Sequence, residues 1–573
     1  MEEFKLERTP DGDRLTVAKC GPDLLRFPLC NKGTGFSADE RRRLGIDGAL
    51  PARHNDIDTQ VERIYKSIFF NPDPVGRSIG LASLQDRNET LYYKLLHEHL
   101  EEAMPIVYTP TVGKASQYYS RVFRRARGIF ITPDHKGRIE EVLRASAPFS
   151  GVRLMVVTDN EAILGIGDQG AGGMAISIGK LALYCVGAGI HPARTLPISL
   201  DVGTNNQELL DDPLYVGWRQ KRISGDAYVA LVDEFVAAAR TVFPGVVIQW
   251  EDFKKDNALM ILDRFRHSLP SFNDDIQGTG AVASACIQAG CRIAGSDFAA
   301  SRIVIYGAGA AGLGIFRQLR EQLARAGAIG DALTSAIIVM DSRGIISDDR
   351  ESLDDYKREM AWPGDMAEEL GLDETGRKDL SAVVAAYKAT ALIGASGQGG
   401  SFTEQTVRAM LEHNDAPIIL PMSNPTSISE AIPLDLMKWT DGRALIATGS
   451  PFEPVSSANG PRRIGQANNV FVFPGIGLGT IVTDASEITD GMIAASADAL
   501  AASLSDADIA ENSLVPDIGR MWDVCGAVAM AVAKQAIADG VAAEANLKTV
   551  QARLADYRWR PKYPEIVVEG ETG

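Results

Sequence analysis

The segment Arg302-Ile-Val-Ile-Tyr306, followed at once by Gly307-Ala-Gly309-Ala-Ala-Gly312, decides the fold of this chain. The first five residues predict a buried strand, and residues 313–326 have the periodicity of an amphipathic helix. Backbone N–H groups in such a strand–turn–helix can approach a pyrophosphate, because none of the turn residues carries a bulky side chain. We therefore expect a dinucleotide to be held by Gly307, Gly309, Ala310, Ala311 and Gly312.

A second segment, Gly165-Ile-Gly167-Asp168-Gln-Gly170, has the same glycine spacing. Its Asp168 lies inside the turn, where the carboxylate would face a phosphate. The structural context of the motif therefore favours residues 307–312 as the dinucleotide site.

The residue that holds the adenosine ribose is expected at the end of the next strand, and Ile337-Ile-Val-Met-Asp341 fits that place. The separation from Gly312 exceeds the usual roughly twenty residues, which requires an insertion around residues 328–334. Asp341 favours a free 2′-hydroxyl, whereas Arg343 can receive a 2′-phosphate. The predicted cofactor is NAD, with NADP left open.

Short β-branched runs alternate with helical stretches on both sides of this turn, at residues 154–158, 196–200, 246–250, 336–340, 391–393 and 417–421. This alternation predicts βαβ units and largely parallel sheets. Residues 37–125 have a helical pattern instead, with a capping box at Ser37–Glu40. The predicted α/β architecture has a helical N-terminal domain (1–126), an α/β domain (127–274, completed by 469–540), a Rossmann-type dinucleotide-binding domain (275–468) and a tail (541–573) that packs on a surface or on a partner subunit.

Composition excludes several classes of protein. The 573 residues carry a net charge of −17, which repels phosphate backbones and anionic membranes, so neither nucleic acid nor a membrane is an expected partner. Lys180 interrupts the weakly polar stretch 173–190, which argues against a spanning helix. The amino terminus has no signal-peptide pattern, and the six cysteines include no C-x-x-C pair. A cytoplasmic location is expected.

Two acidic pairs indicate a metal site. Glu251-Asp252 follows the predicted strand 246–250, and Asp274-Asp275 lies in a predicted loop between domains. Carboxylates gathered at strand ends are ligands for a hard cation such as Mg²⁺ or Mn²⁺. Acidic pairs are also common as solvated loop residues, although the apolar neighbours Trp250 and Phe272 make that interpretation weaker here.

Two further residues are candidates for proton transfer. Lys180 sits within an apolar helical segment, where burial would favour the neutral amine and make it a usable base. The alternative is a lysine that reaches out of a buried helix to solvent. Tyr108 lies between two prolines in Pro105-Ile-Val-Tyr-Thr-Pro110, where a structural tyrosine is the ordinary expectation.

Together these segments resemble the malic enzyme family. The resemblance rests on motifs that occur in the family's order: M-P-I-V-Y-T-P-T-V-G from Met104, G-I-G-D-Q-G from Gly165, G-K-L-A-L-Y from Gly179, L-D-V-G-T-N-N from Leu200, W-E-D-F from Trp250, F-N-D-D-I-Q-G-T-G from Phe272, G-A-G-A-A-G from Gly307, M-S-N-P-T from Met422, T-G-S-P-F from Thr448 and N-N-V-F-V-F-P-G-I-G from Asn468.

The resemblance implies a homodimer or homotetramer that oxidises L-malate with NAD(P) and decarboxylates the product to pyruvate. Lys180 would take the 2-hydroxyl proton, Tyr108 would protonate the enolpyruvate carbon, and Asp274 would tune this pair. The residues implied for the divalent metal are Glu251, Asp252 and Asp275, and those implied for substrate contact are Asn424 and Asn468. Arg63 and Arg87 match an interfacial fumarate site of some animal members.

One departure concerns substrate binding. Family members usually read T-D-x-E-R-I-L-G, where the arginine holds a substrate carboxylate, but this chain has Ala162 in that place. The loss removes charge-assisted hydrogen bonds of about 1.5–3 kcal/mol each, so weak malate binding is expected. Malolactic enzymes, which form lactate with bound NAD and Mn²⁺, also have a small residue there and are the first alternative. A catalytically weak binding or regulatory relative is the second.

Overall fold

The computed structural model describes residues 4–9, 12–18, 20–163, 165–457 and 460–570. The chain forms two compact units: unit 1 is Met1–Ile248 with Ala555–Gly573, and unit 2 is Gln249–Leu554.

The first element of unit 1 is a small sheet that the sequence patterns do not predict. Strands β1 (Phe4–Thr9) and β2 (Gly12–Val17) pair antiparallel, and β17 (Glu565–Val568) adds to β2 in parallel. An isolated two-stranded hairpin is marginal in water, so the third strand from the far end of the chain completes this layer. The tail thus packs on its own chain: Trp559 N–H donates to the Gly189 carbonyl (2.7 Å), and the Tyr563 hydroxyl donates to Gln60 Oε1 (3.2 Å).

Residues 38–122 are helical, as expected. Ser37 and Glu40 form the predicted capping box at the first of these helices. The helices are α1 (Ala38–Arg43), α2 (Ile57–Phe69), α3 (Pro74–Gln85), α4 (Glu89–Glu98), α5 (Leu100–Val107), α6 (Thr111–Gln117) and α7 (Tyr119–Val122).

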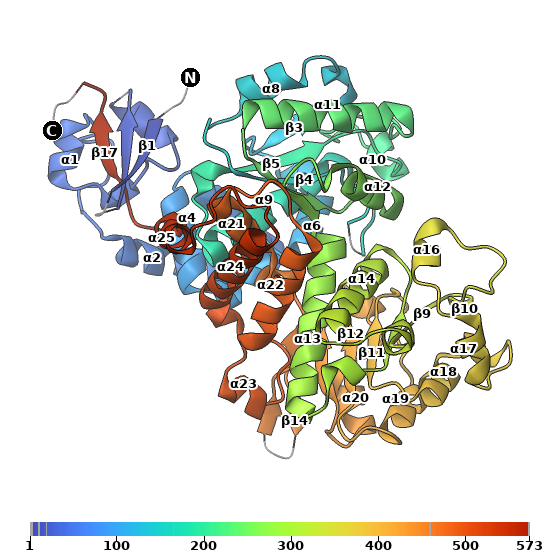
Figure 1. Ribbon diagram of the computed structural model, residues 1–573. Helices are drawn as coiled ribbons and strands as arrows, with labels where there is room; N and C mark the ends of the chain where they lie inside the picture. The colour runs from blue at the N-terminus through green and yellow to red at the C-terminus, as the bar shows by residue number, and fades with distance from the viewer. Residues whose placement is uncertain (1–3, 10–11, 19, 164, 458–459, 571–573) are drawn as a thin grey trace. The chain divides into compact units, whose positions relative to one another are not determined.

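A parallel sheet follows in unit 1. Strand β5 (Thr195–Leu200) pairs with both β3 (Ile129–Ile131) and β4 (Leu154–Thr158). Every residue of β4 and β5 is buried, as expected for parallel strands covered on both faces. Helix α9 (Met174–Leu183) contacts both strands, and α8 (Ile139–Ser146) contacts β3 and α11 (Asp226–Val242) (Figure 1). The short helix α10 (Gln207–Asp211) lies between β5 and α11 in sequence, and β6 (Val247–Glu251) carries the chain into unit 2.

Unit 2 contains a seven-stranded sheet of order β10-β9-β8-β11-β12-β13-β16. All pairings are parallel except that of the edge strand β10. The strands are β8 (Ile303–Tyr306), β9 (Ile337–Asp341), β10 (Gly344–Ile345), β11 (Ala391–Gly394), β12 (Ile418–Pro421), β13 (Leu445–Thr448) and β16 (Gly465–Gln466).

Helices cover both faces of this sheet (Figure 1). On one face, α13 (Thr279–Ala294) and α14 (Ala310–Arg325) contact β12, β8 and β9. Alternate strand residues such as Val304, Leu392 and Ile419 face the other way, into a core shared with α18 (Leu380–Tyr387), α19 (Glu404–Leu411) and α20 (Pro433–Trp439). The doubly covered parallel sheet is the architecture predicted from the alternating pattern.

A helical bundle completes unit 2, with α21 (Phe473–Thr483) and α22 (Asp490–Ala502) packed on α24 (Met521–Ala538). Close approach requires glycine here, since a Cβ at Gly479 would lie 2.6 Å from the Ala529 carbonyl oxygen. The remaining elements of the unit are β7 (Ser271–Asn273), β14 (Val455–Ser457), β15 (Gly460–Arg462), α12 (Lys255–Phe265), α15 (Asp331–Thr334), α16 (Asp355–Glu359), α17 (Gly364–Glu369) and α23 (Asp506–Ala510). Helix α25 (Leu547–Tyr557) leads back to unit 1.

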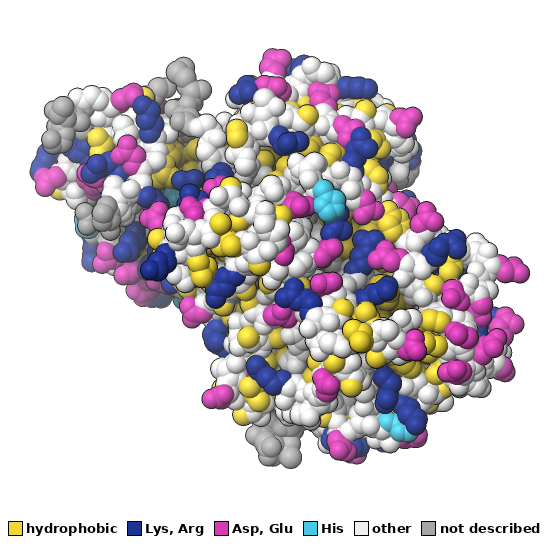
Figure 2. Space-filling view, viewed as in Figure 1, with side chains coloured by type: hydrophobic (Ala, Val, Ile, Leu, Met, Phe, Trp, Pro, Cys, Tyr) yellow, Lys and Arg dark blue, Asp and Glu magenta, His cyan; other side chains and the backbone are white. Residues whose placement is uncertain are grey.

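Two helical stretches are long and apolar enough to cross a membrane by composition, Gly170–Ala188 and Ile518–Ala538. The first is 89% buried and the second 44% buried within the protein. The burial of the first is typical of a core helix, and one or two helices of this composition are weak evidence for a membrane span. On the face seen in Figure 2, basic side chains are interspersed with acidic ones.

Candidate functional site

The glycine turn joins β8 to α14, as the sequence predicts. Gly307 has φ 129°, and a Cβ there would lie 2.3 Å from the Ala395 carbonyl oxygen. A Cβ at Gly312 would lie 2.0 Å from the Gly307 carbonyl oxygen, whereas nothing lies within 4 Å of a Cβ at Gly309. Two glycines therefore permit tight backbone packing, and the third leaves open space in front of the first turn of α14. Ala310 and Ala311 begin that helix, whose N-terminus receives no side-chain cap, so its N–H groups are available to an anion.

Asp341 ends β9, next to the glycine turn, and its carboxylate binds two cations. Arg350 Nη1 lies 3.1 Å from Oδ1, and Lys357 Nζ lies 2.7 Å from Oδ2. Burial alone would raise the pKa of Asp341, but the hydrogen bonds from Lys357 and Arg350 outweigh it and the pKa is lowered. The backbone N–H of Arg343 also donates to Oδ1 (2.8 Å), and Arg343 itself is exposed. Sequence reasoning missed Arg350 and Lys357, because neither lies in a recognisable motif.

The predicted metal ligands lie together. Glu251 ends β6, Asp252 follows with φ 58°, and Asp275 lies in the π-helical turn η7 (Asp274–Gly278) after β7. One carboxylate oxygen from each of the three residues lies within 4.8 Å of the other two. The backbone N–H of Asp252 donates to Asp275 Oδ2 (2.8 Å), and Gln249 Nε2 donates to Glu251 Oε2 (2.8 Å). Three converging carboxylates, two of them buried, are the oxygen-rich set that Mg²⁺ or Mn²⁺ prefers.

The turn that carries Asp275 is packed tightly against α14. A Cβ at Gly314 of α14 would lie 2.0 Å from the Ile276 carbonyl oxygen. A Cβ at Gly280 of α13 would in turn lie 2.5 Å from the Gly314 carbonyl oxygen. The backbone of η7 is therefore fixed by contact with both helices, and so is the placement of Asp275.

Asp274 is fully buried beside Asn469. Asn469 Nδ2 donates to both the carbonyl and Oδ2 of Asp274, at 3.1 Å each. Asn468, which the family resemblance implies for substrate contact, caps the turn before α21 by accepting from the Val470 N–H (3.0 Å). Asn424 follows β12, and its Oδ1 accepts from Ser450 Oγ (3.0 Å).

Within unit 1, Lys180 and Tyr108 are neighbours. A Cβ at Gly179 would lie 2.4 Å from the Val107 carbonyl oxygen, so α9 closely approaches the end of α5. This approach places Lys180 Nζ 5.2 Å from the centroid of the Tyr108 ring. Lys180 is 1% exposed, which excludes the solvated alternative for its side chain, and Tyr108 packs beside a cluster formed by Val112, Ile163 and Ile176.

The glycine motif at residues 165–170 has a structural role. Asp168 accepts from Thr204 Oγ1 (2.8 Å) and the Asn205 N–H (2.8 Å), and Arg222 Nη2 lies 3.0 Å from Asp168 Oδ1. Arg222 also lies 3.8 Å from Asp159 Oδ2. Burial raises the pKa of Asp159 to about 6, although Arg222 opposes this shift. Asp168 therefore holds loops of its own unit together.

Ala162 lies half-buried in this loop, and Leu164 falls outside the described residues. Arg222 contacts carboxylates on both sides of Ala162 in sequence: Asp159 and Glu161 before it and Asp168 after it. Its side chain is only 3% exposed. This guanidinium is therefore engaged by carboxylates of the loop that carries Ala162.

The two arginines considered for an effector site take part in local contacts. Arg63 Nη1 donates to Asn55 Oδ1 (3.3 Å), and its Nη2 donates to Thr34 Oγ1 (3.2 Å). The carbonyl of Arg87 accepts from Asn31 Nδ2 (2.8 Å). The guanidinium of Arg63 and the carbonyl of Arg87 therefore both have hydrogen-bond partners within the protein.

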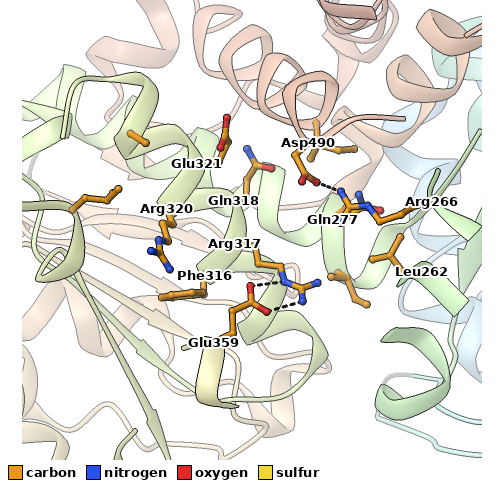
Figure 3. Close-up of a pocket in the computed structure, with 15 residues that line it drawn as sticks. Leu262, Arg266, Gln277, Phe316, Arg317, Gln318, Arg320, Glu321, Glu359 and Asp490 are labelled. Carbon is orange, nitrogen blue, oxygen red and sulfur yellow. Dashed lines mark hydrogen bonds and ion pairs between the residues drawn. The ribbon is translucent and has the colours of Figure 1, made fainter. Parts of the chain in front are cut away.

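A cavity of about 480 Å³ lies beside α14, between α12, α16 and the start of α22 (Figure 3). Four of its charged side chains form two ion pairs. Arg317 forms two hydrogen bonds to Glu359 (2.8 and 2.7 Å), and Arg266 donates to Asp490 (2.6 Å). The predicted site residues do not line this cavity, so it is distinct from the chemistry described above.

Two protein-family models match this chain. The family model described as "Malic enzyme, N-terminal domain" matches residues 85–266. The model described as "Malic enzyme, NAD binding domain" matches residues 276–537, which include the glycine turn and the seven-stranded sheet.

Full-length relatives and solved structures extend this match. A protein of Sodalis glossinidius called NAD-dependent malic enzyme is 44% identical, with 96% of this chain and 97% of the relative aligned. A protein of the same name from Aeromonas salmonicida is 43% identical over the same shares. The crystal structure of Entamoeba histolytica malic enzyme has a TM-score of 0.53 at 22% identity, covering 90% of this chain and 92% of that one, and supports the fold. Because it shares these motifs, matches both family models and is 44% identical to a relative over 96% of its length, this chain belongs to the malic enzyme family.

Proposed function

We propose that this protein oxidises L-malate with NAD and decarboxylates the product to pyruvate and CO₂, with the aid of a divalent metal ion. The observation that carries the proposal is the joint presence of the convergent carboxylates Glu251, Asp252 and Asp275 and the Lys180–Tyr108 pair. The relatives named NAD-dependent malic enzyme support the same reaction.

Both implied cofactors fit the residues present. The open space at Gly309 and the uncapped start of α14 suit a pyrophosphate, and the three carboxylates suit a hard dication. When bound, the dinucleotide would supply the hydride acceptor for malate oxidation, and the metal ion would supply Lewis acidity. Glu251, Asp252 and Asp275 would hold the metal, while Gly307, Gly309, Ala310, Ala311 and Gly312 would hold the dinucleotide.

The protein's own residues move two protons. Lys180 takes the proton from the 2-hydroxyl of malate while the hydride leaves C2, which yields oxaloacetate. Loss of CO₂ then leaves enolpyruvate, and Tyr108 donates a proton to its C3 to give pyruvate. Burial of Lys180 keeps bulk water from its amine, and Asn469 holds the Asp274 carboxylate that we assign to tuning the pair.

NAD is the proposed cofactor, because Asp341 ends β9 with a carboxylate that suits a ribose hydroxyl. Arg343, Arg350 and Lys357 nearby leave NADP as the second candidate. We further propose a cytoplasmic homodimer or homotetramer, on the family resemblance; light scattering of the purified protein tests the assembly.

The decisive experiment supplies L-malate with Mn²⁺ and either NAD or NADP, and measures reduced cofactor, pyruvate and lactate. Pyruvate with equimolar reduced cofactor supports the proposal. Lactate without net reduction would identify a malolactic enzyme, which the small residue at Ala162 keeps as the second candidate. No turnover with any metal or cofactor would identify a binding relative.

A further inference from the structure

We infer that Glu430 is a positioning residue for the nicotinamide half of the dinucleotide, an inference that rests on the proposed use of NAD. Its side chain is 0% exposed, within the loop that precedes α20. No motif in the sequence singles it out. Glu430 belongs neither to the glycine turn nor to the cluster of Glu251, Asp252 and Asp275.

The Glu430 carboxylate joins two loops at the carboxyl ends of the strands of the seven-stranded sheet. Its Oε1 accepts from the N–H and the Oγ of Ser396, at 2.9 Å each, and from Ser423 Oγ at 2.5 Å. Its Oε2 accepts from the Ser423 N–H at 3.3 Å. Ser396 follows β11 and Ser423 follows β12. The four donors are electrically neutral, so the carboxylate acts here as a multiple acceptor that locks two backbone segments together.

The sheet register shows what these loops are next to. Gly394 at the end of β11 pairs with Tyr306 of β8 on one side and with Pro421 of β12 on the other. The glycine turn therefore starts beside the loop that contains Ser396, and a Cβ at Gly307 would lie 2.8 Å from the Ser396 N. A Cβ at Gly394 would lie 2.4 Å from Glu430 Cδ, so glycine is required there to admit the carboxyl group.

The strand order assigns the nicotinamide half to this side. In a doubly wound sheet the dinucleotide lies across the carboxyl ends of the strands, with its pyrophosphate at the glycine turn. Asp341 of β9 marks the adenosine side of β8. The other half of the molecule then extends over β11 and β12, where the loops tied by Glu430 lie. Asn424 directly follows Ser423 in the loop after β12.

Two variants weaken, in different ways, the hydrogen bonds by which Glu430 joins the loops after β11 and β12. In Glu430→Gln, an amide N–H replaces one acceptor oxygen and faces a backbone N–H, so at least one donor of Ser396 or Ser423 loses its partner. Ser423→Ala removes the hydroxyl that donates to Glu430 and accepts from the Gly397 N–H (2.9 Å). Glu404→Gln is the matched control, because Glu404 lies on α19 with a side chain 52% exposed and pairs only with Arg408 among the described residues.

The test measures binding of NADH and of ADP-ribose to the apoprotein by calorimetry, without malate or metal. We expect Glu430→Gln to weaken NADH binding about tenfold, the size of effect that the loss of a buried hydrogen bond produces. ADP-ribose, which lacks the nicotinamide, should be affected less, and Glu404→Gln should bind both like the wild type. Ser423→Ala carries the same expectation where Glu430→Gln fails to fold.

Unchanged NADH affinity in a folded variant would overturn the inference, and so would equal losses for NADH and ADP-ribose, because a merely structural role lowers stability without that discrimination. The measurement stands apart from the proposed reaction: a wild type that binds NADH but does not turn over malate fails the proposed function and still tests Glu430.

Discussion

The substitution Asp275→Asn tests the metal site through its effect on stability as well as on activity. Three carboxylate oxygens lie within 4.8 Å of one another, so the metal-free protein carries their mutual repulsion. Two unit charges at that distance repel by about 1 to 3.5 kcal/mol at effective dielectric constants of about 80 to 20. Neutralising Asp275 removes two such pairs. The Asn Oδ1 can still accept from the Asp252 N–H, so the local backbone is retained.

We take the lower limit of this repulsion, about 1 kcal/mol per pair. Asp275 is only half-buried, so solvent screens its charge. The metal-free variant should then be more stable than wild type by about 2 kcal/mol, which corresponds to a Tm increase of about 3 °C for a unit of this size. With Mn²⁺ the order reverses. Wild type gains about 2.7 kcal/mol at a hundredfold excess over its Kd, whereas the variant gains nothing at that concentration.

The assay is differential scanning fluorimetry with and without chelator, alongside turnover of malate. Asp263→Asn is the control, since Asp263 is an exposed acid of α12 outside the cluster. Mn²⁺ should raise its Tm as much as that of wild type. An equal Mn²⁺ shift in Asp275→Asn, or a metal-free variant less stable than wild type, would refute the assignment of these carboxylates.

Four further outcomes are expected. Ala162→Arg should lower the malate KM about tenfold by restoring a bidentate contact to a carboxylate, and a KM that stays or rises would show that another group already fills that place. Lys180→Ala should stop malate oxidation, whereas Tyr108→Phe should slow ketonisation of supplied enolpyruvate; equal losses in both partial reactions would contradict this division. Asp341→Ala should shift the ratio of kcat/KM values toward NADP, because three basic residues then face the 2′-position without a carboxylate, and an unchanged ratio would place the ribose elsewhere. Burial lowers the pKa of His191 to about 3, so between about pH 6.5 and 3 the unfolded chain binds more protons than the folded protein. The free energy of unfolding should therefore fall as the pH falls through that window. Urea unfolding at stepped pH should show this slope, and His191→Asn should flatten it.

Several features of the protein follow from the sequence alone. The strand and helix around residues 302–326 were predictable because hydrophobic periodicity and glycine spacing are local properties. The two acidic pairs at 251–252 and 274–275 indicated a metal site from the sequence, but the choice of Glu251, Asp252 and Asp275 as its ligands rested on the family resemblance. The capping box at Ser37 is likewise local, because its partners are three residues apart.

The tertiary structure decided what depends on partners distant in sequence. The N-terminal sheet needs β17, which arrives from more than five hundred residues away, and no local pattern contains that pairing. Asp341 binds Arg350 and Lys357 only because the chain folds back after β10, and Asp274 meets Asn469 across almost two hundred residues. Glu430 is an ordinary acid in the sequence. It becomes a buried acceptor for Ser396 and Ser423 because parallel strands bring the loops after β11 and β12 side by side, and burial leaves their donors no water to bind instead.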